Sequence, residues 1–165
     1  AYPYVTPRTT KLLDSIDRFG GDLHQKTLEF EQAGSRVLIK GDSFTAYVPF
    51  AARWPLEAHL LPHRQVGNFT ELTDTERDEL AEIYHRLLKA WDSLYDTPTP
   101  YISAWHQAPL VPAGKNVRLQ LQLTSPRRAA DKLKFLAGSE SAMGAFIGDL
   151  PPENIAGMLR DALTA

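Results

Sequence analysis

Apolar and polar positions along the first third of the chain predict two helices followed by three strands. Residues 11–33 carry apolar side chains at helical spacing on both sides of Gly20-Gly21, which favours a helix, a turn and a second short helix. Two short runs with strand-like composition, 37–40 and 44–48, flank a Gly-Asp pair and predict a β-hairpin. A third strand is expected over 57–61, where Pro62 closes the apolar run.

The clearest predicted element is a long amphipathic helix that begins after Thr73. Thr73 at the N-cap, with Glu76 three residues later, is the sequence signature of a capping box. The apolar residues that follow recur every three or four positions and form one stripe, which needs a sheet or another helix to cover it: Leu80, Ile83, Tyr84, Leu87, Leu88, Trp91 and Leu94.

The last part of the chain predicts two more strands and further helices. One strand covers 101–106, and the other, 117–123, alternates strictly between apolar and polar residues. The basic stretch 126–138 is interpreted as a helical patch, and a last helix is expected from about Pro152. The sum is an α+β protein: an antiparallel sheet of five or more strands with one long amphipathic helix packed on it.

Composition narrows the class of protein. The 165 residues are enough for one domain with a real core, and the net charge of −2 gives no reason to expect nucleic acid as a partner. Cysteine is absent, which removes disulfides, thiolate chemistry and every cysteine-containing zinc site. We find no apolar run of membrane-spanning length and no signal or transit peptide, so a cytoplasmic protein without a membrane partner is expected.

The histidines do not form a complete metal or catalytic set. His106 ends a predicted strand, but the neighbouring strand offers only Gln120 and Gln122, whose amides are weak ligands for transition metals. His59 and His63 are four residues apart, yet Pro62 between them argues against a helix that would bring them together. His24, in a predicted polar turn, and His85, in the long helix, are interpreted as structural.

Nucleophile and nucleotide motifs are also missing: no G-x-S-x-G elbow, P-loop or G-x-G-x-x-G is present. A phosphate-binding element is the better candidate, because basic residues precede a glycine and a carboxylate that could hold sugar hydroxyls. A solvated basic helix face explains the same residues equally well. They are Arg127, Arg128, Lys132, Lys134, Gly138 and Glu140.

Several segments, in order, resemble the C-terminal half of galactose-1-phosphate uridylyltransferases of the histidine-triad superfamily: WPLEAHLLPHRQVGNFTELTDTERDELAEIYHRLLKAWDSLYD, PYISAWHQAP, RLQLQLTSPRR and KFLAGSE. The resemblance covers roughly 36–163. It implies a histidine-triad-like half-barrel, with 1–165 as a single domain in which 1–35 is an N-terminal extension with short helices. In that family the nucleophilic histidine and the zinc-binding cysteines belong to an N-terminal half, so no catalytic residue is expected in this chain. Zinc is expected only in that other half, and the chain is expected to begin just after the nucleophile.

The resemblance also assigns substrate-binding residues. A K-[FY]-x-[VA]-G-x-E motif that contacts hexose phosphate is matched by Lys134, Phe135 and Glu140. A further glutamine contact of the family falls near Phe146, which has no amide. The family's second metal site would use His106, but Gln120 and Gln122 stand where two further histidines are needed. No metal is therefore expected in this chain, and His106 is the remnant of a vestigial position.

The implied activity is transfer of a uridylyl group between UDP-glucose and galactose-1-phosphate through a covalent uridylyl-histidine. The chain would contribute hexose-phosphate contacts and a subunit interface, and it would be inactive without an N-terminal half. Expected partners are that half, a second copy in a homodimer, hexose-1-phosphate and UDP-hexose. Two alternatives remain open: a non-catalytic sugar-phosphate- or nucleotide-binding or structural module, and, more weakly, a related adenylyltransferase acting on dinucleoside polyphosphates.

Overall fold

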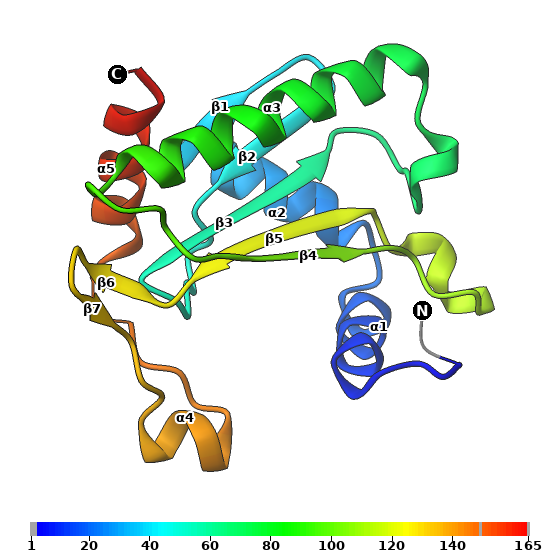
Figure 1. Ribbon diagram of the computed structural model, residues 1–165. Helices are drawn as coiled ribbons and strands as arrows, with labels where there is room; N and C mark the ends of the chain where they lie inside the picture. The colour runs from blue at the N-terminus through cyan, green and yellow to red at the C-terminus, as the bar shows by residue number, and fades with distance from the viewer. Residues whose placement is uncertain (1–2, 149, 165) are drawn as a thin grey trace.

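The computed structural model describes residues 3–148 and 150–164, and it is a sheet with helices on both faces (Figure 1). The helices are α1 (Pro7–Phe19), α2 (Leu23–Gln32), α3 (Asp74–Ser93), α4 (Gly138–Met143) and α5 (Pro152–Thr164), with 3-10 turns η1 (Phe69–Glu71) and η2 (Pro112–Asn116). The strands are β1 (Val37–Lys40), β2 (Phe44–Tyr47), β3 (Leu56–Pro62), β4 (Ile102–His106), β5 (Gln120–Ser125), β6 (Arg127–Ala129) and β7 (Lys132–Leu133).

Five strands form one antiparallel sheet in the order β1-β2-β3-β5-β4, so β4 lies at an edge. Because directly paired residues of antiparallel strands share a face, the register assigns every side chain to one of two faces. One face is apolar and continuous across the sheet: Ala46 on β2 pairs with Leu60 on β3, Leu60 with Leu121 on β5, and Leu121 with Trp105 on β4.

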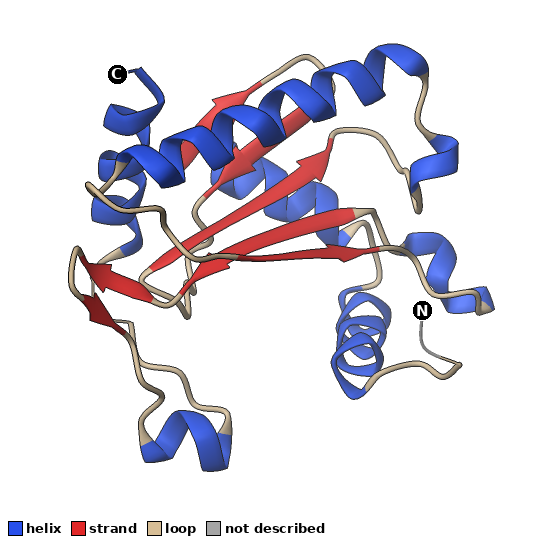
Figure 2. Ribbon diagram, viewed as in Figure 1, coloured by secondary structure: helices blue, strands red, loops and turns tan. Residues whose placement is uncertain are grey.

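The main core lies between this apolar face and the helices α3 and α5 (Figure 2). The stripe predicted on the long helix supplies Leu80, Ile83, Leu87 and Trp91, all of them buried. On the opposite face, α2 covers a smaller cluster in which its Leu28 packs against Tyr47 and Leu61. The sheet is therefore dry on one side and partly polar on the other, and the polar side is the one available for chemistry.

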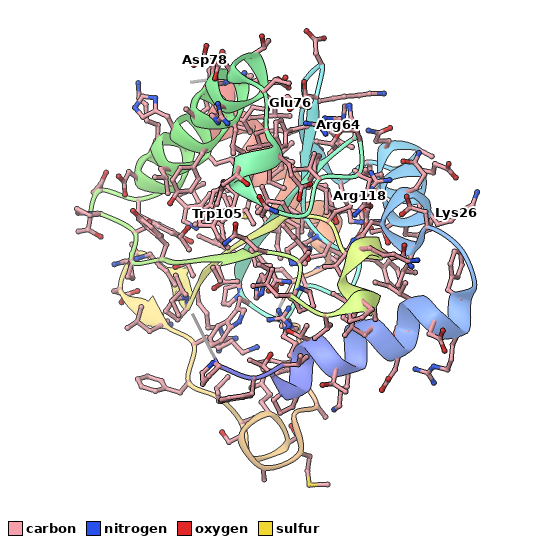
Figure 3. The ribbon with its side chains drawn as sticks, turned by 90° about the vertical axis from the view of Figure 1, so that its right-hand side faces the viewer. Lys26, Arg64, Glu76, Asp78, Trp105 and Arg118 are labelled. Atoms are coloured by element: carbon pink, nitrogen blue, oxygen red, sulfur yellow. The ribbon has the colours of Figure 1, made fainter. Side chains whose placement is uncertain are left out.

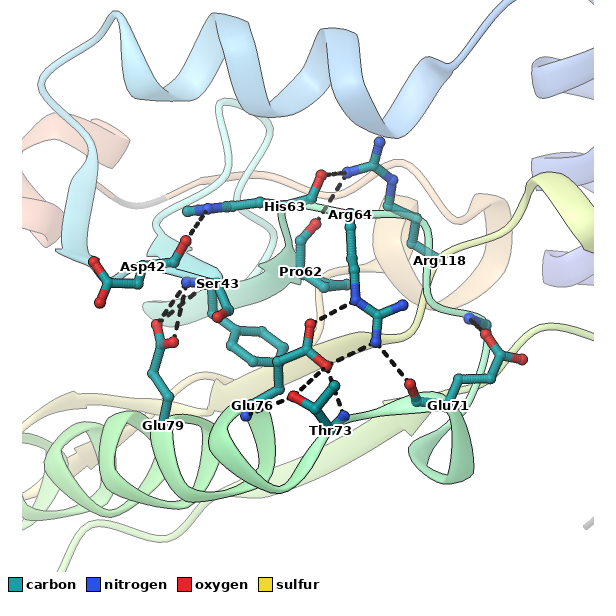
Figure 4. A network of polar contacts seen from close by, with 12 residues as sticks. Asp42, Ser43, Pro62, His63, Arg64, Glu71, Thr73, Glu76, Glu79 and Arg118 are labelled. Atoms are coloured by element: carbon teal, nitrogen blue, oxygen red, sulfur yellow. Dashed lines mark hydrogen bonds and ion pairs between the residues drawn. The ribbon is translucent and has the colours of Figure 1, made fainter.

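The start of α3 is fixed by the predicted capping box. The Thr73 hydroxyl accepts a hydrogen bond from the backbone N–H of Glu76 at 3.2 Å, and Glu76 Oε2 accepts one from the backbone N–H of Thr73 at 2.8 Å. The Arg64 guanidinium grips the same carboxylate with two hydrogen bonds of 2.6 and 2.7 Å (Figure 4). These hydrogen bonds, led by the one from Arg64, outweigh burial and lower the pKa of Glu76 to about 2. The segment after β3 is thus tied to the helix that covers the core.

Replacing Thr73 with alanine is expected to lower the free energy of unfolding by about 1 kcal/mol, because the hydroxyl acceptor at the helix N-terminus is lost. Urea denaturation followed by far-UV circular dichroism measures this. Thr70→Ala is the matched control, since Thr70 bonds only to Asn68 in an exposed turn. Equal losses in both variants would contradict the capping role.

The predicted fold class is confirmed, and so is the order of the strands and helices, with two corrections. The basic stretch 126–138, predicted as helical, contains the two-stranded hairpin β6–β7, followed by a loop up to the start of α4 at Gly138. Pro126 separates it from β5 and accepts a hydrogen bond from the backbone N–H of Lys134, which closes the hairpin at 2.6 Å. Strand β5 runs over 120–125 in place of the predicted 117–123, because the backbone N–H groups of Val117 and Leu119 bond to Gly114 and Val66 and not to a neighbouring strand.

Candidate functional site

The polar face of the sheet gathers titratable side chains from three strands. His59 on β3 is paired with Gln122 on β5, and Gln120 on β5 is paired with His106 on β4, so all four side chains share a face. Glu57 lies two residues before His59 and therefore joins the same row. The sequence predicted the juxtaposition of His106 with the two glutamines, but it gave no reason to include Glu57 and His59.

Glu57 is the most enclosed charge of this row. Its carboxylate accepts hydrogen bonds from the backbone N–H groups of Arg53 and Trp54, at 2.7 and 3.3 Å, and from the Arg53 guanidinium at 3.3 Å. His59 Nε2 lies 2.9 Å from the same carboxylate, and Gln120 Nε2 lies 3.1 Å from His59 Nδ1. A neutral His59 that donates from Nε2 and accepts at Nδ1 satisfies both contacts. The residues Glu57, His59 and Gln120 form one hydrogen-bonded chain across two strands.

The pKa of Glu57 shows that these hydrogen bonds and charges keep its carboxylate ionised. Burial by itself raises the pKa of the carboxyl, but the hydrogen bonds from His59 and from the Arg53 backbone, together with the charge of Arg53, outweigh it and lower the pKa to about 2. Burial acts on His106 in the opposite direction, because it disfavours the protonated imidazole. Burial, and then the positive charge of Arg8, lower the pKa of His106.

The residues around His106 do not fit a metal ion. The position offers one imidazole and two amides, and the amide nitrogen of Gln120 is already engaged by His59. Within residues 3–148 and 150–164, no group of three histidine, cysteine or carboxylate side chains is arranged to hold a metal. The expectation of an empty second metal site stays a prediction, supported by this donor set. His106 Nε2 is nonetheless buried and has no hydrogen-bond partner among the described residues.

The Lys134 and Glu140 predicted to contact substrate lie together, at the base of a projecting segment. Lys134 Nζ is 2.7 Å from Glu140 Oε1, and both side chains are buried. The ammonium also donates to the backbone carbonyls of Arg53 and Ile147, at 3.0 and 2.6 Å. Glu140 in turn accepts from the backbone N–H groups of Ala137 and Ile147. The Lys134–Glu140 pair therefore stabilises the backbone conformation of the segment 134–147 through these hydrogen bonds.

Aromatic side chains of this segment behave differently from one another. Phe135, also predicted to contact substrate, has 88% of its surface exposed. Phe146 packs against the Trp54 ring and under the Arg53 guanidinium.

Arg127, from the basic cluster of the sequence, makes structural contacts. It donates a hydrogen bond to the backbone carbonyl of Pro98 and lies over the Tyr95 ring. The basic cluster of the sequence is thus divided between structural contacts and the Lys134–Glu140 pair.

The remaining histidines are structural or peripheral. His63, just after β3, bonds to Thr45 and to the backbone carbonyl of Asp42. His85 lies on the exposed face of α3. His24 corrects the prediction of a polar turn: it lies in the first turn of α2, buried, where desolvation and then the charge of Arg118 lower its pKa to about 4.

The sequence analysis did not place Glu57 and His59 beside His106, and it did not include Arg53, which lies just before β3. The only available signal was the E-x-H spacing of Glu57 and His59, which places both on one face of a strand. The spacing alone does not predict a site, because the partners of Glu57 and His59 come from β5 and from the turn at Arg53.

The arrangement of helices and sheet is similar to the fold of a solved histidine-triad structure. The structure of a hypothetical histidine triad nucleotide-binding protein from Sulfolobus tokodaii strain7 is similar in fold, with a TM-score of 0.57 and 11% identity, over 86% of this chain and 91% of that one. At this identity the likeness concerns the fold alone.

Within that class, the sequence identifies the family. The family described as galactose-1-phosphate uridyl transferase, C-terminal domain, matches residues 15–163, and the chain belongs to it. A solved uridylyltransferase mutant is similar with a TM-score of 0.88 and 34% identity, over 98% of this chain and 55% of that one. The galactose-1-phosphate uridylyltransferase of Thermotoga maritima is 33% identical over 167 residues, covering 98% of this chain and 52% of the relative. That of Streptomyces lividans is 42% identical over 117 residues, covering 66% and 33%.

The chain thus spans between a third and about half of the length of these relatives. None of the helices in the described part of the chain is both long and apolar enough to cross a membrane.

Proposed function

We propose that this chain is the C-terminal half of a galactose-1-phosphate uridylyltransferase, which acts on UDP-glucose and galactose-1-phosphate together with an N-terminal half. The observation that carries the proposal is the match of residues 15–163 to the C-terminal domain of that family. The nucleophilic histidine would come from the N-terminal half, since the polar face of this chain presents no nucleophile activated by a base among the described residues.

The segment 134–147 is the proposed hexose-phosphate contact. Lys134 places a positive charge near the phosphate, Glu140 accepts hydrogen bonds from hexose hydroxyls, and the exposed Phe135 packs against the sugar. Because Lys134 Nζ already donates to two carbonyls and a carboxylate, a direct bond to phosphate requires that one of these acceptors be released. A phosphate dianion is the stronger acceptor, since charge-assisted hydrogen bonds exceed those to neutral carbonyls.

Exposed apolar side chains around this segment support a protein partner. Five large apolar residues of the segment that projects from the sheet and carries α4 (Figure 1) have at least 42% of their surface exposed: Leu133, Phe135, Leu136, Met143 and Ile147. Such a cluster is typical of an interface. We propose that it packs against the N-terminal half or a second copy of the chain, so that the hexose-phosphate contact is completed by assembly.

The direct experiment mixes the purified chain with a separately expressed N-terminal half of a family member and assays formation of UDP-galactose. Turnover that requires both chains is expected. In the reconstituted enzyme, Lys134→Ala should lower kcat/KM by about a hundredfold, because the substrate phosphate loses a preorganised cation. Lys132→Ala is the matched control, since Lys132 is exposed on the same hairpin.

Melting curves recorded for each variant separate lost chemistry from lost folding. No turnover at any ratio of two folded, associating halves would overturn the proposal. Binding of galactose-1-phosphate without turnover, abolished by Lys134→Ala, would instead favour a non-catalytic sugar-phosphate module.

A further inference from the structure

We infer that the cleft between α1 and the β4–β5 end of the sheet binds a phosphate monoester. The cleft has a volume of about 300 Å³ and lies on the polar face, where α1 runs beneath η2 and the ends of β4 and β5 (Figures 1 and 3). The residues whose polar groups carry the inference are Arg8, Lys11, His106, Arg118, Gln120 and Gln122. None of them belongs to the Lys134–Glu140 pair.

The lining of the cleft is rich in donors and contains no carboxylate. It presents two guanidinium groups and one ammonium group, together with amides and hydroxyls. Within the described part of the chain, neither Arg8 nor Lys11 forms an ion pair or a side-chain hydrogen bond. A wider groove of about 650 Å³ near the α1–α2 turn lacks this bias, because Asp17 and Asp22 line it opposite Lys115.

Two buried nitrogens of the lining have no partner. Arg118 is 97% buried, since only 3% of its surface is exposed, and its charge is offset by Asp22 at 2.6 Å. Its Nη atoms are satisfied by Asp22, Gln25 and backbone carbonyls, but its Nε–H finds no acceptor among the described residues. His106 Nε2 is also buried without a partner. A buried donor left without an acceptor is costly, and a ligand oxygen in the cleft would satisfy the Arg118 Nε–H, and His106 Nε2 in the tautomer that carries its proton there.

The charged side chains that line the cleft are all cationic. Burial, and after it the nearby charge of Arg53, lower the pKa of Arg8, while Glu57 opposes this only in part. Glu57 is turned to Arg53 and His59 and does not line the cleft. An entering anion therefore meets the unpaired charges of Arg8 and Lys11 directly.

A phosphate monoester fits this charge better than a carboxylate. It carries close to two negative charges at neutral pH and offers three acceptor oxygens, which matches two unpaired cations and several donors. A carboxylate brings one charge and two oxygens, and it would leave one of the cations without a counterion.

The test titrates the whole chain with inorganic phosphate, with a simple phosphate monoester and with acetate, following ¹H–¹⁵N spectra that include the glutamine side-chain amides. The expected result is saturable shifts of the Gln120 and Gln122 amides by both phosphates, at concentrations on the order of 1 mM, and none by acetate. The double variant Arg8→Gln/Lys11→Gln should weaken binding about tenfold or more, since two charge-assisted contacts are removed.

Both substituted side chains are exposed and unpaired, so the variant is expected to fold. Lys89→Gln, an equal change of charge at an exposed position on α3, should leave binding unchanged. The same shifts should persist in Lys134→Ala, which separates this cleft from the hexose-phosphate contact. Absence of shifts at 20-fold the expected concentration, equal weakening by Lys89→Gln, or equal response to acetate would each overturn the inference.

Discussion

Glu57→Gln is expected to lower the free energy of unfolding at pH 7 by about 3 kcal/mol. The pKa of Glu57 is lowered from 4.5 to about 2 in the folded chain, and each unit of difference corresponds to roughly 1.4 kcal/mol. The amide of glutamine has one acceptor oxygen, so it cannot replace both the oxygen that accepts from the backbone of Arg53 and Trp54 and the oxygen bonded to His59. The variant therefore loses a buried, ionised acceptor, while the groups that donated hydrogen bonds to it remain buried.

The pH dependence follows from the direction of the shift. A lowered folded-state pKa means that the unfolded chain binds a proton first as the pH falls. The stabilisation from Glu57 is therefore complete above about pH 5 and is lost progressively as the pH falls from 4.5 toward 2. Glu76, with a pKa also lowered to about 2, adds to the acid sensitivity in the same interval.

Urea denaturation of wild type and Glu57→Gln at pH 7, and at steps between pH 5 and 2.5, measures both effects. The difference between the two proteins should shrink as the pH falls. Glu82→Gln is the control: Glu82 is exposed on α3 and makes only a long ion pair, so its loss should cost little. A difference that stays constant down to pH 2.5 would contradict the assignment of the effect to the Glu57 carboxylate.

Trp91→Ala is expected to be the most destabilising of the changes considered, with a loss of about 3–5 kcal/mol. Trp91 has no exposed surface and lies in the core between α3, α5 and the apolar face of the sheet. Alanine removes the ring and leaves a cavity that a tightly packed α/β interface fills only in part.

Trp91→Phe separates the ring from its polar group. The indole N–H of Trp91 is buried without an acceptor among the described residues, so phenylalanine gives up volume but no hydrogen bond. Its loss should be less than half of that of the alanine variant, as measured by urea denaturation at pH 7. A loss as large as that of alanine would contradict ring packing as the main contribution of Trp91.

Local rules explain why much of the fold could be predicted. The stripe on α3 and its capping box depend on residues three and four apart, and both are present as expected. The hairpin β1–β2 likewise depends on a short turn between two strand-like runs. The prediction of a helix in the basic stretch was wrong because basic residues occur equally on a helix face and in a hairpin. The hairpin is closed by a hydrogen bond between Lys134 and the Pro126 carbonyl, eight residues away, which local spacing does not reveal.

The sequence by itself determined the α+β class, the long helix and its N-cap, and the presence of a family motif at Lys134, Phe135 and Glu140. Only the tertiary structure decided which polar residues act together. Glu57, His59 and Gln120 become one hydrogen-bonded chain because β3 and β5, about sixty residues apart, pair in one register. Arg8 and Arg118 line one cleft because α1 lies beneath the β4–β5 end. Side-chain type and spacing act within a few residues, whereas charge and hydrogen-bond partners are set by whatever the packed elements bring close.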